Sequence, residues 1–540
     1  MPRQRSGNMA DGVPLWAIQS GLNRAVPPTR IPEDGLAEAF NVIIDDGRLF
    51  PRPGARPTLR YGPELTNLPC SLIGLFLNRS TGVFTPYRAE SDFGTNQLEF
   101  FRWDGTNWAS VVGGLGTTRD ATPSFTHFRD TALLIPGNGN LYRWNADTLD
   151  LIDVESTQPV PELQPPRACR YITTNAVRAF MANGRGPGTD PDSERFSNRI
   201  WWCSTARPDI WSNGTGNPDR FSASFFDLDT DTYPITGLAF HSGQQVIAFK
   251  DWSIHFAQWR GSPKWYDFVP MATRIGCVAH KTIKQWRERM LFLGADCNVY
   301  AIDLRGSIVA VGDAIQPYME RIVNYERLNR SVAWVDLIDN YYWLVVPTEA
   351  HGGEYGRHIF CLNLTTGAWT EGEFADPGLE VLDAFQARVF DEFVFYLLGA
   401  ADGRIYEYDH FNLMADRDTQ WESYVWSKVY DFMEYFRQVA ETGSIHKLAL
   451  HGDSGLAIGR ARTGRTLSMV AADTSIQTFG QINQDLAQVR ADLARTRGYV
   501  SGRTIDQRFG QWGIQWPAGT QTPMSVDGIT AWSNPGGETR

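Results

Sequence analysis

A five-residue pattern recurs seven times between residues 101 and 406, about once every 50 residues. We call it the tag: an apolar residue, an aromatic residue, a variable residue, an apolar residue and a turn residue. The clearest copies are residues 100–104, 141–145, 299–303 and 405–409, and weaker copies are residues 200–204, 254–258 and 359–363. A repeat of this period indicates an array of like units, each too small to bury its own core.

Apolar runs precede the tags, each followed by a loop and then the tag, at 72–76, 132–136, 245–249, 290–293, 341–346 and 393–398. The unit therefore reads as an inner buried strand, the tagged strand and an outer strand. Turns at 105–108 and 366–369 place Trp108 and Trp369 on outer strands, and 305–308 is an equivalent turn without the Trp. We predict a mainly β protein whose residues 61–410 form a β-propeller of about six to eight blades, because radial closure protects sheet edges.

The flanking segments differ from the repeats. Residues 1–60 are predicted to be an extended N-terminal arm, because its prolines block helix; one short helical turn is expected within 31–40 and a hairpin at Asp46-Gly47. Residues 411–540 are predicted to be a C-terminal β-rich domain. Its expected elements are a strand or helix within 421–440, a strand, turn and strand over 445–462, an amphipathic helix near 476–496, and strands at 513–516 and 528–532. Within the repeats we expect one helix at 315–328 and a mobile loop at 183–198.

Composition excludes some functions. The net charge is −11 and the pI about 5.4, so the chain has the wrong sign to wrap DNA tightly, although DNA could slide past it without sticking. The six cysteines form no CxxC pair and are expected to be buried free thiols. No secretory signal and no apolar run of membrane-spanning length is found, so no membrane segment is expected.

No catalytic, cofactor-binding or metal-binding residue is predicted, and the chain is not expected to be an enzyme. His446 and His451 lack the carboxylates of a zinc site, and 227–231 lacks the glycine and glutamate of a calcium loop. The stretch 451–455 lacks the Trp of a propeller-glycosidase turn, and 184–188 lacks the Lys-Ser/Thr of a phosphate loop. The tag tyrosines could line a sugar-binding surface, but blade packing explains them better: Tyr142, Tyr300 and Tyr406.

The arm carries a family resemblance. Its motifs are Gly21-Leu22-Asn23, Ile31-Pro32-Glu33-Asp34, Ala39-Phe40-Asn41-Val42, Gly47-Arg48-Leu49 and Arg52-Pro53-Gly54. They resemble the opening of β-propeller proteins of the tail hub or nozzle of short-tailed (podovirus-type) phages, also known as head-completion or packaged-DNA-stabilisation proteins. Ser20 stands where that family usually has a second Gly. The layout is similar over the whole chain, and the motifs cover about 35 residues.

The resemblance implies a virion structural protein made in the bacterial host cytoplasm and located in the virion tail. It implies a ring, expected to be a hexamer, below the portal and adaptor proteins and in contact with tail fibres or tail tip proteins. The ring would retain packaged viral DNA and conduct it during ejection through the lumen, without specific binding. The alternative is a carbohydrate-binding or polysaccharide-degrading tail propeller, an adhesin or depolymerase.

Overall fold

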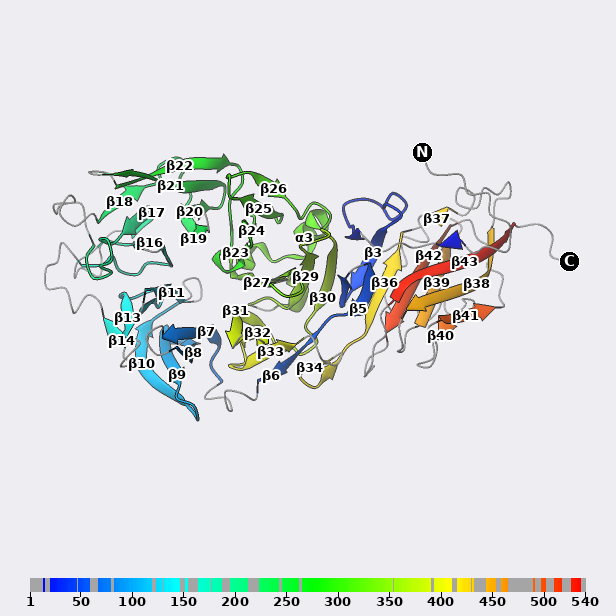
Figure 1. Cartoon of the computed structure of the whole chain (residues 1–540), viewed down its shortest axis with the longest axis horizontal. Helices are drawn as coiled ribbons and strands as arrows, with labels where there is room; N and C mark the ends of the chain where they lie inside the picture. Colours follow the sequence, from blue (N-terminus) through cyan, green and yellow to red (C-terminus); the bar gives the residue numbers. More distant parts are fainter. Residues whose placement is uncertain are drawn as a thin grey trace.

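The tag is the third strand of every blade. The computed structural model describes residues 13–14, 20–45, 47–58, 67–78, 82–118, 123–129, 131–145, 151–153, 164–175, 177–186, 195–211, 223–241, 245–261, 265–352, 354–389, 393–409, 415–428, 430–431, 443–452, 458–464, 489–490, 497–501, 509–516 and 526–535. Over these residues it is a β-propeller joined to a second group of strands, with few helices (Figure 1).

The first four blades are consecutive four-stranded antiparallel meanders. Blade 1 contains β7 (Cys70–Asn78), β8 (Val83–Asp92), β9 (Gln97–Trp103) and β10 (Trp108–Gly116). Blade 2 contains β11 (Ser124–Phe128), β12 (Thr131–Ile135), β13 (Tyr142–Asn145) and β14 (Leu151–Asp153). Blade 3 contains β15 (Tyr171–Thr174), β16 (Ala179–Arg185), β17 (Arg195–Trp202) and β18 (Ser224–Asp227). Blade 4 contains β19 (Ile235–His241), β20 (Gln245–Lys250), β21 (Ser253–Gly261) and β22 (Trp265–Thr273).

Three blades remain, and blade 7 closes the propeller. Blade 5 contains β23 (Lys284–Trp286), β24 (Arg289–Leu293), β25 (Val299–Asp303) and β26 (Ile308–Ala310). Blade 6 contains β27 (Val332–Asp336), β28 (Tyr341–Val346), β29 (His358–Asn363) and β30 (Trp369–Glu373). Blade 7 contains β31 (Val381–Val389), β32 (Phe393–Ala400), β33 (Ile405–Asp409) and, from the other end of the chain, β6 (Gly54–Pro57). Six of these sets are separate sheets, and blade 6 is the set that continues into a larger sheet.

Seven hydrophobic clusters among the described residues join each blade to the next, the last one joining blade 7 to blade 1. Strand β28 shows how one strand serves two clusters. Tyr341, Trp343 and Val345 pack toward blade 7, and the alternate residues Tyr342, Leu344 and Val346 pack toward blade 5. Side chains alternate along a strand, so a strand buried on both faces must be apolar throughout. This explains the continuous apolar runs, and the propeller prediction is confirmed.

The repeat unit has four strands rather than the three read from the sequence. In blades 2, 4, 5, 6 and 7 the apolar run is the second strand, and a further strand lies inside it, nearer the propeller axis (Figure 1). Two of the inner strands, β11 and β23, are short and carry polar residues. Such strands give no strong hydrophobic pattern, which explains why the sequence did not reveal these two.

The structure also explains why the tag ends in a turn residue such as Asp or Asn. The Asp104 Oδ1 atom accepts the backbone N–H groups of Thr106 and Asn107, at 2.8 and 2.7 Å. Asp303 and Asn363 accept two backbone N–H groups in the same way. A short polar side chain that accepts backbone N–H groups two to four residues further along stabilises the tight turn to the outer strand. The predicted turns and the positions of Trp108 and Trp369 on outer strands are confirmed.

The N-terminal arm is made of strands. They are β1 (Val13–Pro14), β2 (Gly21–Leu22), β3 (Gly35–Phe40), β4 (Val42–Asp45) and β5 (Arg48–Pro51), followed by β6 of blade 7. The hairpin β4–β5 is confirmed, with Asp45 opposite Arg48. The helical turn expected within 31–40 is wrong, because Gly35–Phe40 pairs with neighbouring strands on both sides. Six residues are too few to nucleate a helix against that pairing.

The strands from residue 415 onward belong to two large sheets, apart from a two-stranded pair at 415–420 that forms a sheet of its own. They are β34 (Ala415–Asp416), β35 (Thr419–Gln420), β36 (Ser423–Ser427), β37 (Tyr430–Asp431), β38 (Gly443–Gly452), β39 (Ile458–Gly464), β40 (Val489–Arg490), β41 (Arg497–Ser501), β42 (Phe509–Trp516) and β43 (Val526–Pro535). One sheet has the order β4-β5-β43-β38-β41, with β1 also on β43; the other runs from blade 6 as β30-β2-β3-β36-β42-β39-β40. The strands at 445–462, 513–516 and 528–532 are therefore confirmed, but β38 and β39 enter different sheets.

The remaining predictions agree with the structure only in part. The helix expected at 315–328 is two short ones, α3 (Gln316–Ile322) and η3 (Tyr325–Arg330), separated by the extended Val323 and Asn324. Both ends of the loop expected at 183–198 are strand instead, because β16 runs to Arg185 and β17 begins at Arg195, and 187–194 lies outside the described residues. The helix near 476–496 lies outside the described residues except Val489–Arg490, which is strand β40, and 432–440 also lies outside. Two further short 3₁₀ helices are η2 (His280–Thr282) and η4 (Glu349–His351).

All six cysteines are buried free thiols, as the sequence indicated. Burial raises the pKa of Cys70 and Cys297 to about 11 and that of Cys203 and Cys277 to about 12. We expect none of the six to react with a colorimetric disulfide reagent at pH 8 in the folded protein, and all six to react in denaturant, because only an accessible thiolate attacks. Rapid labelling of two or more thiols without denaturant would contradict this packing.

Candidate interaction site at the junction of the arm, blade 6 and the C-terminal strands

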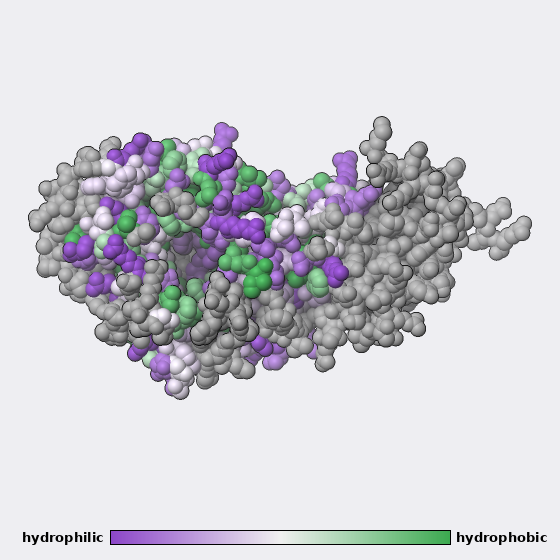
Figure 2. All heavy atoms as spheres, in the orientation of Figure 1, coloured by the Kyte–Doolittle hydropathy of each residue, from purple (hydrophilic) through white to green (hydrophobic). Residues whose placement is uncertain are grey.

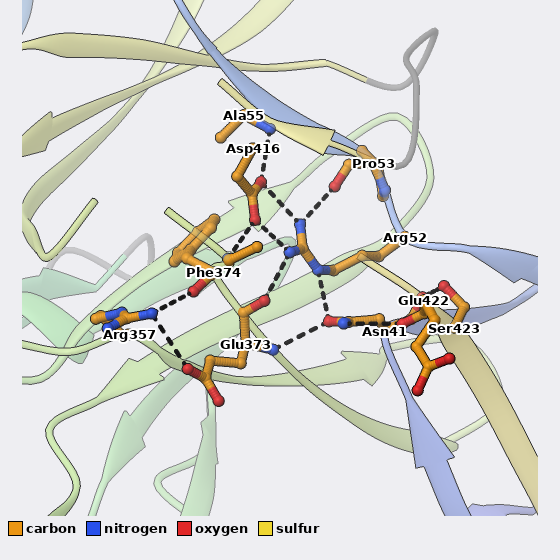
Figure 3. A network of polar contacts seen from close by, with 11 residues as sticks. Asn41, Arg52, Pro53, Ala55, Arg357, Glu373, Phe374, Asp416, Glu422 and Ser423 are labelled. Carbon is orange, nitrogen blue, oxygen red and sulfur yellow. Dashed lines mark hydrogen bonds and ion pairs between the residues drawn. The ribbon is translucent and has the colours of Figure 1, made fainter. Parts of the chain in front are cut away.

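A buried polar network joins three parts of the chain. Its centre is Arg52, between β5 and β6, whose side chain is almost fully buried. The guanidinium donates to Asp416, with Nη2 at 2.6 Å from Oδ2 and Nη1 at 3.2 Å from Oδ1. It also donates to the carbonyl oxygens of Pro53 and Glu373 and to Asn41 Oδ1 (Figure 3). Every nitrogen of this buried cation therefore has a partner, which burial of a charge requires.

The partners of Arg52 are themselves fixed. Asp416 accepts the backbone N–H groups of Ala55 in β6 and Ala375 after β30, at 3.0 and 2.8 Å. The Arg52 guanidinium carbon lies 3.8 Å from the centre of the Trp421 ring, a cation–π contact. Burial would lower the pKa of Arg52, but the Asp416 carboxylate outweighs it and raises that pKa. The Arg52 guanidinium therefore stays charged at any ordinary pH.

Asn41 is the second centre of the network. It has a left-handed backbone with φ 54°, a conformation that asparagine tolerates better than most residues. Its Oδ1 accepts from Arg52 Nε and from the backbone N–H of Glu373, at 2.8 and 3.0 Å, and its carbonyl accepts from Ser423 Oγ at 2.7 Å. Asn41 and Arg52 both belong to the resemblance motifs, so these motifs occupy positions that hold the junction together.

A second ion pair lies on the same edge of blade 6. Arg24 Nη2 lies 2.7 Å from Glu371 Oε1, and His358 Nε2 lies 3.7 Å from the other oxygen. Arg24 also stacks over the Tyr318 ring of α3, at 5.0 Å. Burial would raise the pKa of Glu371, but Arg24 and His358 outweigh it and lower the pKa to about 2.

This ion pair makes the unfolding free energy of the chain depend on pH. The Glu371 pKa is lower in the folded chain than its ordinary 4.5, so its contribution is complete above pH 4.5 and is lost as pH falls toward 2. We expect the wild type to lose about 2–3 kcal/mol of unfolding free energy between pH 5 and 2.5 that a Glu371→Gln variant does not lose. Urea denaturation followed by tryptophan fluorescence at each pH measures this difference, and parallel pH curves for the two proteins would contradict it.

The turn η2, which precedes β23 of blade 5, makes contacts across the propeller axis. Lys281 Nζ donates to the carbonyl oxygens of Ser71 in blade 1 and Leu382 in blade 7, both at 2.8 Å, and lies 3.5 Å from Asp383 Oδ1. The His280 ring lies 5.0 Å from Tyr171 of blade 3, and Tyr342 of blade 6 donates to the Thr282 carbonyl at 3.0 Å. One turn from blade 5 thus reaches four other blades around the axis.

The residues weighed from sequence as possible sites have structural partners. Asp227 pairs with Arg199, Asp229 accepts from Asn198, and Asp231 pairs with Lys250, so these carboxylates do not converge. Tyr300 and Tyr406 each donate to an Asp four residues earlier, at 2.5 and 2.7 Å, and Tyr142 packs between blades 1 and 2. In the described ranges no group of three or more His, Cys, Asp and Glu side chains is placed to hold a metal ion.

Some of those stretches are described only in part. His446 and His451 lie in β38, of whose side chains nothing is described. Residues 453–455 of the first stretch and 187–188 of the second lie outside the described residues. Sequence reasoning missed the junction itself. The signal was present in the arm, where Asn41 and Arg52 stand among the resemblance motifs, but nothing in the sequence pointed to Asp416 as their partner. Within the part of the chain that is described, the helices are all too short to span a bilayer.

Comparisons with known proteins identify no family for this chain. No family model and no curated protein matches this chain. Similar solved structures include virginiamycin B lyase from Staphylococcus aureus, with 11% identity over 64% of this chain and 95% of that one and a TM-score of 0.40. The Pan2 WD40 domain of Neurospora crassa has 10% identity over 68% of this chain and 97% of that one, with a TM-score of 0.36. YCF48 from Cyanidioschyzon merolae has 12% identity over 66% of this chain and 100% of that one, with a TM-score of 0.37. Likeness at this level carries no argument about function.

Proposed function

We propose that this chain is a virion structural protein that forms the tail hub or nozzle ring of a short-tailed phage, below the portal and adaptor proteins. The observation that carries the proposal is the continuous sheet from blade 6 through β2, β3 and β36 to β42 and β39. A propeller on a flexible tether cannot hold a fixed angle to its neighbours, whereas one joined through shared strands can. A closed ring needs subunits of fixed geometry.

Three further features support a role as the wall of a channel rather than as an enzyme. Lys281 of η2 binds carbonyl oxygens of blades 1 and 7 across the propeller axis, so we expect a polymer to pass beside the propeller and not through it. On the face seen in Figure 2, described hydrophobic side chains lie in several small groups separated by hydrophilic ones. The net charge of −11 would repel DNA in the lumen and keep it mobile.

The proposal is tested by assembly. The purified chain would be measured by mass photometry and negative-stain imaging, alone and with the portal and adaptor proteins of the same virus. We expect rings, and six is the copy number that the resemblance implies. A chain that stays monomeric at high concentration and never assembles on portal or adaptor would overturn the proposal.

The contribution of the arm to ring contacts needs a surface substitution, because deletion of residues 1–60 would also remove β6 and open blade 7. Val26 is an exposed apolar residue of the arm, and Val177 of blade 3 is similarly exposed, at 36% and 40%. If the arm forms the ring contact, Val26→Glu should weaken assembly and Val177→Glu should not. Equal assembly of the two variants would count against a ring contact made by the arm.

Carbohydrate binding is the second candidate, favoured by a pocket in blade 4 that is lined by the exposed aromatic residues Tyr233 and Trp252. Glycoside hydrolysis by the usual route needs two carboxyl groups on either side of the scissile bond. One carboxylate, Asp231, lines this pocket, and Lys250 and Ser253 already donate to it. The arrangement favours binding over hydrolysis.

A further inference from the structure

The pocket in blade 4 is formed at one end of its sheet. It has a volume of about 480 Å³ and is lined by the segment before β19, the β20–β21 turn and the end of β22, through Thr230, Asp231, Tyr233, Trp252, Ser253, Thr273 and Arg274. This volume lies within the range of pockets that hold small ligands. It is separate from the junction network and from the turn that crosses the axis.

A buried ion pair fixes the shape of the pocket. Lys250 is fully buried, and its Nζ donates to Asp231 Oδ1 at 2.8 Å and to the carbonyl oxygens of Leu228 and Asp231 at 2.7 and 3.1 Å. Ser253 Oγ donates to the other oxygen of Asp231 at 2.6 Å. The backbone N–H of Arg274 donates to the Trp252 carbonyl at 2.7 Å. These bonds hold all three segments before any ligand arrives, which lowers the entropic cost of binding.

Two aromatic rings face solvent on this fixed frame. Tyr233 is 45% exposed and Trp252 is 39% exposed, although elsewhere in the propeller most tryptophans of the blades are buried. A flat aromatic ring held in a pocket offers an apolar face with a polar tip. The C–H face of a pyranose ring is a matching partner, because it is apolar while its hydroxyl groups point outward.

The charge in the pocket comes from Arg274. Burial would raise the pKa of Asp231, but the hydrogen bonds from Lys250 and Ser253 outweigh it and lower that pKa, so Lys250 and Asp231 neutralise each other. Burial lowers the pKa of His255, which contacts Thr230, to about 4, so this ring is neutral at pH 7. The exposed guanidinium of Arg274 remains, and arginine binds carboxylate groups in a bidentate manner.

We propose that this pocket binds an acidic saccharide, with a sugar ring stacked on Trp252 and Tyr233 and its carboxylate on Arg274. The proposal rests on the second candidate function and gives it a site and a ligand class. It does not depend on ring assembly, so failure of one leaves the other standing.

The test is calorimetric titration of the full chain with galacturonate tetramer, hyaluronan tetramer and sialyllactose, and with neutral maltotetraose. We expect at least one acidic saccharide to bind with a Kd in the range of about 0.1–1 mM, more tightly than maltotetraose. Trp252→Ala should weaken that binding about tenfold or more. Arg274→Gln should remove the preference for the acidic saccharide over the neutral one.

The matched control is Trp259→Ala. Trp259 lies in β21 of the same blade, is 55% exposed and does not line the pocket, so its loss should leave binding unchanged. All variants would be checked for unchanged melting temperature. Equal loss of binding in Trp259→Ala and Trp252→Ala, or no measurable binding of any of the three acidic saccharides, would overturn the proposal.

Discussion

Substitution of Arg52 by methionine is expected to lower the free energy of unfolding by about 3–5 kcal/mol, because it leaves the buried carboxylate of Asp416 without its cation. The same change also removes donors to the carbonyl oxygens of Pro53 and Glu373 and the contact with Trp421. Urea denaturation followed by tryptophan fluorescence measures the loss.

The control is Arg207→Met. Arg207 pairs with Asp209 at 2.9 Å, but its side chain is 58% exposed, so water screens the pair. We expect a loss below about 1 kcal/mol there. The double variant Arg52→Met/Asp416→Asn should recover part of the loss, since the neutral amide no longer needs a cation and can still accept from Ala55. An Arg52→Met variant no less stable than Arg207→Met would show that the network does not hold the junction.

Substitution of Gly21 by alanine is expected to destabilise the chain by about 4–5 kcal/mol, more than most single substitutions. Gly21 has φ +71°, and a Cβ there would lie 2.6 Å from the Trp369 carbonyl oxygen and 2.7 Å from its nitrogen. Neither backbone atom can move easily, because Trp369 is buried and its Nε1 donates to the Val311 carbonyl at 2.7 Å. The unfolding midpoint in urea measures the effect.

Gly82 provides the comparison, because it has the same φ of +71° and open space where a Cβ would stand. Gly82→Ala should therefore show only the cost of the left-handed conformation, about 1–2 kcal/mol. The difference between the two alanine variants isolates the close approach of β2 to β30. Similar losses of unfolding free energy in the two variants would mean that β2 and β30 are not tightly packed at Gly21.

The propeller could be predicted from the sequence because its signal is local and repeated. The tag combines an Asx-type turn at Asp104, Asp303 and Asn363 with strands buried on both faces, and these patterns are visible in a single stretch of chain. Inner strands such as Lys284–Trp286 escaped prediction because they are short and partly polar. Closure of blade 7 by Gly54–Pro57 also escaped it, since no local pattern tells which distant strand will pair.

The junction was harder to predict for the same reason. Arg52 and Asp416 are separated by 364 residues, and an arginine next to prolines reads as an ordinary surface residue. The strand Gly35–Phe40 was read as helical because Leu, Ala and Glu favour helix, but its place between two neighbouring strands decided its structure. Non-local pairing of this kind is what a single sequence shows least.

The turn that crosses the propeller axis has a consequence for how large a passage could be. Lys281, which precedes blade 5, binds carbonyl oxygens of blades 1 and 7, so this turn obstructs the axis of a single copy at that level. Any opening wide enough for a double helix would have to lie between copies. Its diameter would then follow from the number of copies that assemble, and adding or losing a blade would leave it unchanged.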